Sequence, residues 1–297
     1  MLKKAIVLMA YNRPDYFIQT CLSVKPQVTD EDVIIFLDGA VNTEKGEFLD
    51  WNGVSHGSAS NAKLVERSRA IALEVFPDAK VYHNSVNAGC GLQWAAMLST
   101  VFDFLYYDEI IVIEDDLILS SHYIKTVNEM LYRFKDDFRV GMVSAFSERS
   151  KEEHDPYLDR LTTCGHLWGV GIWKSRWAMW RNYMIEWSKV YHKHKEFDID
   201  KVLKHVRSLG GKKTEGAAND GLLYNAMLKN NQIPISTVAN CAKYIGEMGA
   251  HGTKEFFASQ GFADMPFHQS SVSYTPPDNE FFESLLNHLK EAYGFYI

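Results

Sequence analysis

Four short apolar runs follow one another early in the sequence and constrain the fold more than any other feature. They are Ala5–Ala10, Val33–Leu37, Lys80–His83 and Glu109–Glu114. Continuous apolar runs of this length are typical of parallel strands buried on both faces. Helical patterns lie between three of the runs, so we expect right-handed βαβ crossovers. The sequence therefore predicts an α/β fold with a mainly parallel central sheet flanked by helices.

Start signals and apolar spacing place the helices. Pro14 suits the first turn of a helix that reaches Val24. A second helix, capped by Ser60 or Asn61, is expected to reach Val75. Further helices are expected at Gly91–Leu105, Ser121–Phe134, Trp187–Lys195, Asp198–Leu209, Asp220–Leu228 and Asn279–Ala292, a strand at Val140–Phe146, a loop at Gly210–Ala218 and irregular chain at His251–Pro277.

Composition narrows the class of protein. The 297 residues suit one α/β domain with a C-terminal elaboration, and 46% hydrophobic residues predict a sizeable core. A net charge of −7 argues against a surface built for nucleic acid. No apolar run approaches the roughly 18 to 20 residues that cross a bilayer, so any membrane association would be peripheral. The apolar start Ala5–Ala10 is read as a strand and not as a signal peptide.

The cysteines indicate a reducing compartment. They are far apart and form no CxxC pair: Cys21, Cys90, Cys164 and Cys241. Such spacing is a poor pattern for a zinc site or a disulfide framework. We therefore expect reduced thiols and a cytoplasmic location, with peripheral membrane association left open.

Three acids stand at the end of the fourth apolar run. Glu114, Asp115 and Asp116 directly follow Ile110–Ile113, so they are expected at the carboxyl edge of the sheet, where α/β proteins bind their ligands. Adjacent carboxylates repel one another, and such a cluster takes a cation, a proton or free solvation. Mn²⁺ or Mg²⁺ suits oxygen ligands and bridges to phosphates. The alternatives are a solvated strand end or a cap for the helix near Ser121.

In chain order, three motifs resemble the nucleotide-sugar half of GT-A glycosyltransferases. They are Ala10–Pro14 (AYNRP), Leu37–Gly39 (LDG) and Ile113–Asp116 (IEDD). The resemblance is strongest to N-acetylglucosaminyltransferase I type enzymes and to bacterial family 2 members with an EDD motif. It implies a Rossmann-like GT-A fold in which Asp116 binds the metal ion and Asp115 faces the ribose or donor sugar.

The resemblance continues downstream. Trp168–Trp173 is similar to a glycine-rich aromatic segment beside the donor sugar, and Asp220 matches the position of the family's catalytic base. The segment Tyr244–Gly246, followed by Ala250–Thr253, resembles a terminal motif that implies a metal contact from His251. The chain departs from the family where Asn219 replaces a Trp and where Ala250 replaces a Thr.

These similarities imply a complete set of site residues. Asp220 is the expected base and Asp116 and His251 the expected metal ligands; the donor is expected to contact Ala10, Tyr11, Arg13, Asp38, Asn87, Gln93, Glu114, Asp115, Trp168 and Gly169. Lys243 and Lys254 are candidates to assist the phosphates. The implied domain plan is a GT-A domain over 1–254, with a nucleotide-sugar part at 1–117 and an acceptor part at 118–254, and an extension at 255–297 that ends in an amphipathic helix.

The expected reaction is metal-dependent transfer of a sugar from a UDP-, GDP- or dTDP-sugar to an acceptor hydroxyl. An inverting transfer requires a base, so Asp220 is the prediction; helix capping is its structural alternative, and Glu215 and Glu247 are substitutes. His251 could instead be an ordinary histidine. Asn84 and Asn87 could simply form a turn.

Other interpretations stay open. The expected acceptor is a glycan or a lipid-linked glycan. The basic stretch Lys189–Lys213 is usually read as a solvated helix face, but it would also suit an anionic acceptor such as a phospholipid-linked glycan or, less favoured, a hydroxylated base in nucleic acid. A nucleotidyltransferase would need a glycine-rich phosphate loop, which Tyr11–Pro14 is not. A non-catalytic carbohydrate-binding module on the same fold is the remaining alternative.

Overall fold

A central sheet of eight strands, in the order β5-β2-β1-β6-β10-β8-β11-β9, organises the chain. The structure, a computed structural model, describes residues 2–40, 47–49, 55–148, 158–193, 219–248 and 254–293. In sheet order the strands are β5 (Lys80–His83), β2 (Asp32–Leu37), β1 (Lys4–Ala10), β6 (Glu109–Glu114), β10 (Gly169–Trp173), β8 (Val140–Ser144), β11 (Ile233–Thr237) and β9 (Leu161–Thr162). Strands β10 and β9 run opposite to the other six. The predicted α/β fold with a mainly parallel sheet is confirmed.

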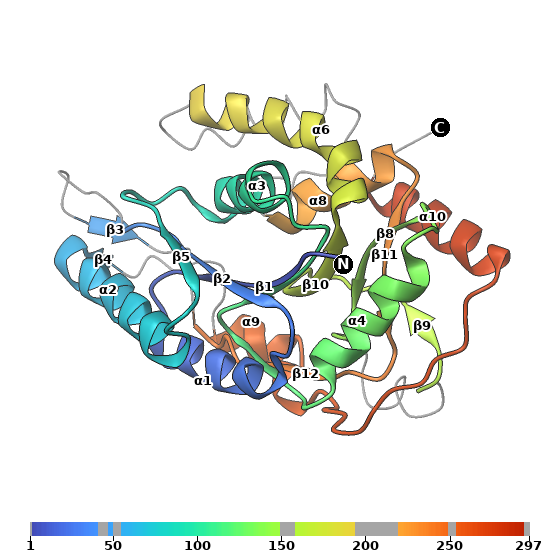
Figure 1. Cartoon of the computed structure of the whole chain (residues 1–297), viewed down its shortest axis with the longest axis horizontal. Helices are drawn as coiled ribbons and strands as arrows, with labels where there is room; N and C mark the ends of the chain where they lie inside the picture. Colours follow the sequence, from blue (N-terminus) through green and yellow to red (C-terminus); the bar gives the residue numbers. More distant parts are fainter. Residues whose placement is uncertain are drawn as a thin grey trace.

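Helices cover both faces of the sheet (Figure 1). On one face lie α3 (Cys90–Ser99), α6 (Lys174–Lys193) and α8 (Asn219–Lys229); on the other lie α1 (Pro14–Val24), α2 (Ser58–Val75) and α4 (Tyr123–Phe134). The smaller elements are η1 (Lys25–Gln27), a π-helical turn η2 (Thr100–Phe104), α9 (Lys254–Ser259), η4 (Phe262–Asp264), α10 (Asn279–Tyr293) and the short strands β3 (Glu47–Leu49), β4 (Ser55–Gly57), β7 (Leu117–Leu119) and β12 (Ala242–Tyr244).

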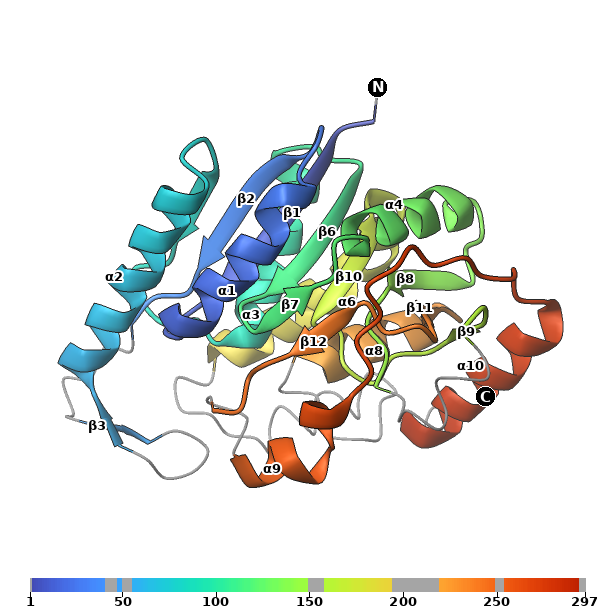
Figure 2. The same cartoon turned by 90° about the horizontal axis from the view of Figure 1, so that it is seen from below.

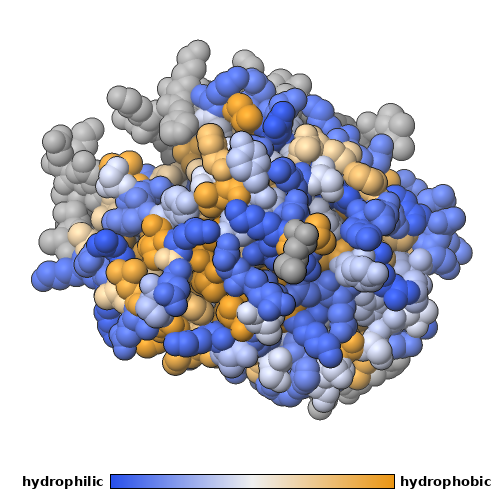
Figure 3. All heavy atoms as spheres, viewed as in Figure 1, coloured by the Kyte–Doolittle hydropathy of each residue, from blue (hydrophilic) through white to orange (hydrophobic). Residues whose placement is uncertain are grey.

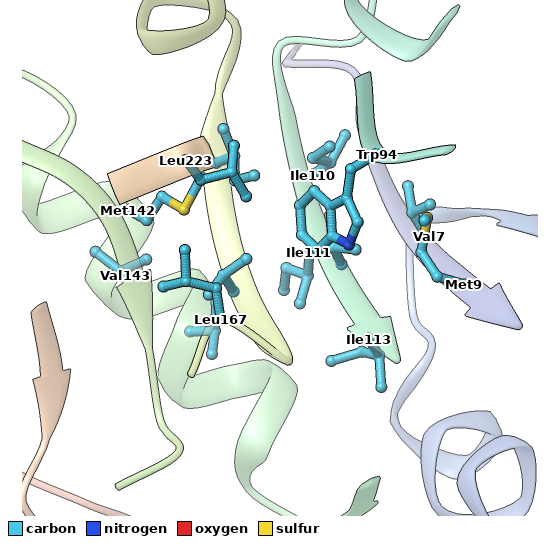
Figure 4. Close-up of a cluster of buried hydrophobic side chains, with 14 of the residues drawn as sticks. Val7, Met9, Trp94, Ile110, Ile111, Ile113, Met142, Val143, Leu167 and Leu223 are labelled. Carbon is cyan, nitrogen blue, oxygen red and sulfur yellow. The ribbon is translucent and has the colours of Figure 1, made fainter. Parts of the chain in front are cut away.

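The first half matches the sequence prediction closely because its strands are buried on both faces. All four predicted strands are present, and α1 has the predicted bounds. Trp94 of α3 and Ile110 and Ile111 of β6 belong to the same buried hydrophobic core (Figure 4). The predicted helix over Gly91–Leu105 is instead α3 followed by the η2 turn.

The second half differs from the sequence prediction in several places. The helix predicted at Trp187–Lys195 begins at Lys174, directly after β10. Strands β10 and β11 were not predicted, because glycines interrupt the first and Pro234 stands inside the second. The strand predicted at Val140–Phe146 ends at Ser144. The chain predicted to be irregular after residue 251 contains α9 and η4. The helix predicted at Asp198–Leu209 and the loop predicted at Gly210–Ala218 lie outside the described residues.

The C-terminal helix α10 joins the main core. Phe282 and Leu289 of this helix are buried in the same hydrophobic cluster as the strands. Hydrophilic side chains cover much of the face in Figure 3, with hydrophobic ones among them. Among the described helices, none combines the length and the hydrophobicity that crossing a membrane requires.

Candidate functional site

The carboxyl ends of β1, β2 and β6 lie at one edge of the sheet, toward β12 and α9 (Figure 2). The register of the strands makes these three ends lie side by side, since Ala10 pairs with Leu37 and Met9 pairs with Glu114. The residues that follow each strand therefore come to the same edge. The sheet thus brings together the predicted motifs that begin at Ala10, Leu37 and Ile113.

The two acids that directly follow β6 are buried. Asp115 is 3% exposed and Asp116 is 2% exposed. Arg13 forms ion pairs with both: one Nη contacts Asp115 Oδ1, and Nη1 lies 2.7 Å from Asp116 Oδ2. Glu114 faces the other way, and its Oε1 accepts a hydrogen bond of 3.0 Å from the Trp94 indole. The acids are therefore neither a solvated strand end nor a cluster without a counter-ion.

Two oxygens of this cluster have no hydrogen bond within the described part of the chain. They are Asp115 Oδ2 and Asp116 Oδ1, and both are buried. A buried carboxylate oxygen without a partner is costly, so each oxygen fits a ligand such as a hard divalent cation. No group of three or more His, Cys, Asp or Glu side chains is arranged to hold a metal ion among the described residues. A cation here would rely on one or two carboxylates together with substrate oxygens, as Mg²⁺ sites often do.

Burial changes the acidity of this cluster. It raises the pKa of Asp116 to about 6; Arg13 opposes this rise, and repulsion from Asp115 adds to it. Burial also raises the pKa of Glu114 well above its usual range, and Asp116 and Asp220 raise it further. Perturbed carboxylates gathered at a ligand-binding edge are typical of functional sites.

Strand β12 and the two residues that follow it lie against Asp116. Strand β12 pairs with β7 in an antiparallel ladder, and the Ile245 N–H donates to the Asp116 carbonyl oxygen at 2.9 Å. At Gly246 an added Cβ would lie 2.4 Å from Asp116 Oδ2 and 2.5 Å from the Tyr244 hydroxyl oxygen. Only a glycine fits between these groups. The family resemblance includes Tyr244–Gly246, but no pattern in the sequence predicts the contact of Gly246 with Asp116.

We expect Gly246→Ala to lower metal-dependent binding of a nucleoside diphosphate sugar about 10-fold, because the methyl group displaces the Asp116 carboxylate or Tyr244. The free energy of unfolding should fall by about 1–3 kcal/mol, as for other overpacked sites. Calorimetric titration and urea unfolding measure the two effects.

The matched control for this variant is Gly141→Ala. There the added methyl group would meet Met227 at 2.6 Å, inside the core. It should lower stability while leaving donor binding unchanged. Equal losses of donor binding in both variants would show that Gly246 has no specific effect on Asp116.

Several aromatic rings pack against one another at the site. Trp168 has the His166 ring at 4.1 Å on one side and the Tyr244 ring at 4.0 Å in a second stacked contact. Phe262 packs edge-on against Trp168 and Tyr244 at 5.6 and 4.9 Å. The Trp168 ring is therefore held by two stacked contacts with the protein's own rings. Of the stacked rings, Tyr244 lies near Asp116 and His166 contacts Asp220.

Asp220 lies at the start of α8, but its carboxylate contacts residues outside that helix. Oδ1 accepts from the Leu167 N–H at 3.1 Å, and Oδ2 lies 3.4 Å from His166 Nδ1. Its side chain is 20% exposed. The carboxylate therefore holds the aromatic segment as well as standing at a helix start. Glu148 lies on the far side of His166 and accepts the backbone N–H of that residue at 2.6 Å. Glu148 and His166 belong to none of the sequence motifs described above.

Asp38 organises the loop after β5. Its buried carboxylate accepts hydrogen bonds from Asn84 and from the backbone N–H groups of Gly39, Ala88 and Gly89, at 2.8–3.0 Å. Asn87 donates to the Gly39 carbonyl oxygen at 3.2 Å. These bonds fix the loop at the carboxyl edge. Any effect of Asp38 on a bound ligand would therefore be exerted through the position of this loop.

The other predicted donor contacts lie around the same edge. The Gln93 amide is buried and donates to the Phe36 carbonyl oxygen at 3.1 Å, and the Tyr11 hydroxyl donates to Asn61 at 3.0 Å. Gly169 is buried, and its carbonyl oxygen accepts from Tyr123 at 2.8 Å.

The remaining predicted residues divide between described and undescribed parts of the chain. Lys243 lies on β12, opposite Ile118 of β7, and Lys254 begins α9. His251 and Glu215 lie outside the described residues. The basic stretch also lies outside them, apart from its first residues in α6.

A large hollow of about 1010 Å³ lies elsewhere, along α4 and the chain near Tyr274. Its lining mixes charges of both signs, among them Lys125, Glu129 and Arg133. None of the acids at the carboxyl edge lines it. We therefore place the functional site by its chemistry and not by this hollow.

Comparison with known proteins gives only distant similarity. No protein-family model matches the chain, and no curated protein sequence matches it. Among solved structures, glucosyl-3-phosphoglycerate synthase from Mycobacterium tuberculosis, in complex with Mn²⁺, UDP and glucosyl-3-phosphoglycerate, aligns with a TM-score of 0.41 and 11% identity, over 100% of this chain and 81% of that one.

Two further structures are similar at the same level. TarS from S. aureus aligns with a TM-score of 0.42 and 11% identity over 81% of this chain and 59% of its own. The glycosyltransferase GlyE from Streptococcus pneumoniae aligns with a TM-score of 0.35 and 12% identity over 69% of this chain and 43% of its own. Similarity at this level leaves the function to be argued from the site itself.

Proposed function

We propose that the chain is a metal-dependent GT-A glycosyltransferase that moves a sugar from a nucleoside diphosphate sugar to an acceptor hydroxyl. One observation carries the proposal: two buried carboxylate oxygens, on Asp115 and Asp116, have no hydrogen bond in the described part of the chain and lie at the ligand-binding edge of the sheet. A third carboxylate, Asp220, is close enough to raise the pKa of Glu114 beside them. A cation site and a separate base are what this transfer requires.

The metal ion proposed here is Mn²⁺ or Mg²⁺, held by Asp116. When bound, such an ion supplies a Lewis acid that stabilises the negative charge on a diphosphate leaving group. Asp115 is proposed to orient the ribose or donor sugar. His251 remains a second proposed ligand on the resemblance alone.

Arg13 is proposed to form ion pairs both with the acids and with the diphosphate of the donor. Its side chain is 25% exposed, so it lies at the boundary between the buried acids and solvent. A guanidinium also suits the oxygens of a diphosphate. With Arg13 on the acids, part of their negative charge is compensated before a donor arrives.

Asp220 is proposed to act as the base of an inverting transfer. The Leu167 N–H fixes one carboxylate oxygen, and Oδ2 points to His166 at the aromatic stack. A base held in this way would accept the proton of the acceptor hydroxyl as that oxygen attacks the anomeric carbon. The acceptor itself is proposed to be a glycan or lipid-linked glycan, and a cytoplasmic location stays a prediction from the sequence.

Donor hydrolysis tests the function without knowledge of the acceptor. Purified protein is incubated with UDP-, GDP- and dTDP-sugars and either Mn²⁺ or Mg²⁺, and release of the nucleoside diphosphate is measured. We expect slow release from one donor class, lowered on the order of 100-fold by a chelator because the leaving group loses its Lewis acid.

Two results would count against the proposal. Release that is unaffected by the chelator would exclude the metal-dependent mechanism. Tight donor binding by calorimetry, with neither hydrolysis nor transfer to any glycan in an acceptor panel, would support the non-catalytic binding module instead.

A further inference from the structure

His166 lies between two carboxylates that come from distant parts of the chain. Its Nδ1 is 3.4 Å from Asp220 Oδ2, and its Nε2 is 4.0 Å from Glu148 Oε2. We propose that His166, anchored by Glu148, is a positioning residue that fixes the Asp220 carboxylate and, as an imidazolium, keeps it ionised. The role of Asp220 as a base rests on the function proposed above, but the His166–Asp220 interaction itself can be tested separately.

The ring of His166 is held in a defined position. It stacks on Trp168 with an interplanar angle of 3°, and Phe262 packs edge-on at 6.2 Å. The backbone is fixed as well, because the N–H of His166 donates to Glu148 Oε1 at 2.6 Å. A Cβ added to Gly165 would lie 2.7 Å from the other Glu148 oxygen, so the chain passes tightly around this carboxylate. A ring fixed in this way can hold the carboxylate that it contacts.

Asp220 lies close to other carboxylates, and a cation beside it would offset their repulsion. Asp220 raises the pKa of Glu148 and of Glu114, so it repels each of these two carboxylates. Burial is the main cause that raises the pKa of Glu148, and His166 opposes it. Two neutral groups also face the cluster, each with a pKa raised mainly by burial: Cys164 and Tyr224.

A base must be ionised to accept a proton, and nearby carboxylates disfavour that state. An imidazolium between Asp220 and Glu148 compensates both of them. Loss of the imidazolium would therefore leave the Asp220 carboxylate beside Glu148 without a compensating positive charge. Activity would then be lost at a higher pH as the solution is acidified.

The first experiment measures the interaction without any catalytic assay. The ring of His166 is titrated by NMR in the full chain and in Asp220→Asn, and its signals are assigned by their loss in His166→Phe. We expect the pKa of His166 to fall by about one unit in Asp220→Asn, because an opposite charge in contact has been removed. An unchanged pKa would overturn the proposal, even if the chain is a glycosyltransferase.

The second experiment measures the effect on the reaction. His166→Phe keeps a ring to stack on Trp168, and His166→Gln keeps a hydrogen-bonding group; neither carries charge. In both we expect kcat for donor hydrolysis to fall about 10- to 100-fold, with donor KM within about threefold and the acidic limb of the pH profile about one unit higher. His288→Gln, at an exposed position on α10, is the control that should leave all three values unchanged.

Several outcomes separate the possible failures. An unchanged kcat and pH profile in both variants would overturn the positioning role. A lower thermal stability with equal losses in kcat and donor binding would show a merely structural role, which also overturns it. If the wild-type chain hydrolyses no donor, the proposed function fails, and the NMR titration alone decides the His166–Asp220 interaction.

A double variant tests the part assigned to Glu148. If Glu148 acts through His166, then Glu148→Gln should add little to the loss already present in His166→Gln. Fully additive losses in kcat would overturn this part of the proposal.

Discussion

Asp116→Asn is expected to abolish the metal-dependent part of donor binding, a loss on the order of 100-fold or more in affinity. The amide keeps the volume of the side chain but removes the charge that a hard cation requires. It also leaves Arg13 paired with Asp115 alone, so less of the positive charge of Arg13 is neutralised within the buried cluster. Calorimetric titration of the donor with Mn²⁺ and again with a chelator measures the loss directly.

The control for this variant is Asp30→Asn. Asp30 is exposed and stands just before β2, at the end of the sheet opposite to the carboxyl edge. Its substitution should leave donor and metal affinities as they are in the wild type. If Asp116→Asn binds donor and Mn²⁺ like the unaltered chain, the assignment of the metal site is wrong.

The second large effect is expected for Asp220→Asn, which should leave donor binding intact and lower turnover by about 10²- to 10⁴-fold. The asparagine can still accept the Leu167 N–H, so the aromatic segment stays in place. It cannot take a proton from an attacking hydroxyl. Rates of donor hydrolysis and donor affinities, measured under the same conditions, separate the two properties.

A second carboxylate tests the specificity of this result. Glu247 was the alternative base within the described chain, and it is exposed just after Gly246. We expect Glu247→Gln to retain most of the turnover. Retained activity in Asp220→Asn together with a large loss in Glu247→Gln would move the base to Glu247. Retained activity in both would call for a different base or a retaining mechanism.

The sequence predicted the first half of the sheet because burial on both faces leaves a continuous apolar run in the chain. The same rule failed at β10 and β11. Strand β10 alternates glycine with larger residues, since a side chain at Gly169 or Gly171 would meet α4 within 3 Å. Strand β11 contains Pro234, which usually argues against a strand. In both cases packing against neighbouring elements overrides the local pattern.

The candidate site was predictable only in part. The acids at 114–116 and Asp220 stand in recognisable positions along the chain, and the structure brings them to one region. The ion pairs of Arg13 with Asp115 and Asp116 were not predictable, because these residues are far apart in sequence, with 102 positions between Arg13 and Asp115. His166 and Glu148 belong to no motif and meet Asp220 only in the folded chain. Their one signal was the position of His166 two residues before Trp168 in the aromatic segment.

The pairing of β7 with β12 has a consequence for how the site is assembled during synthesis. Asp116 leaves the ribosome more than a hundred residues before Ile245 and Gly246, which lie against it in the folded chain. A nascent chain that ends before β12 contains all three acids and Arg13 but lacks the backbone that covers Asp116. Such a fragment should bind a donor poorly even if its parallel strands have formed, because the pocket around this carboxylate is completed by a segment that emerges much later than Asp116.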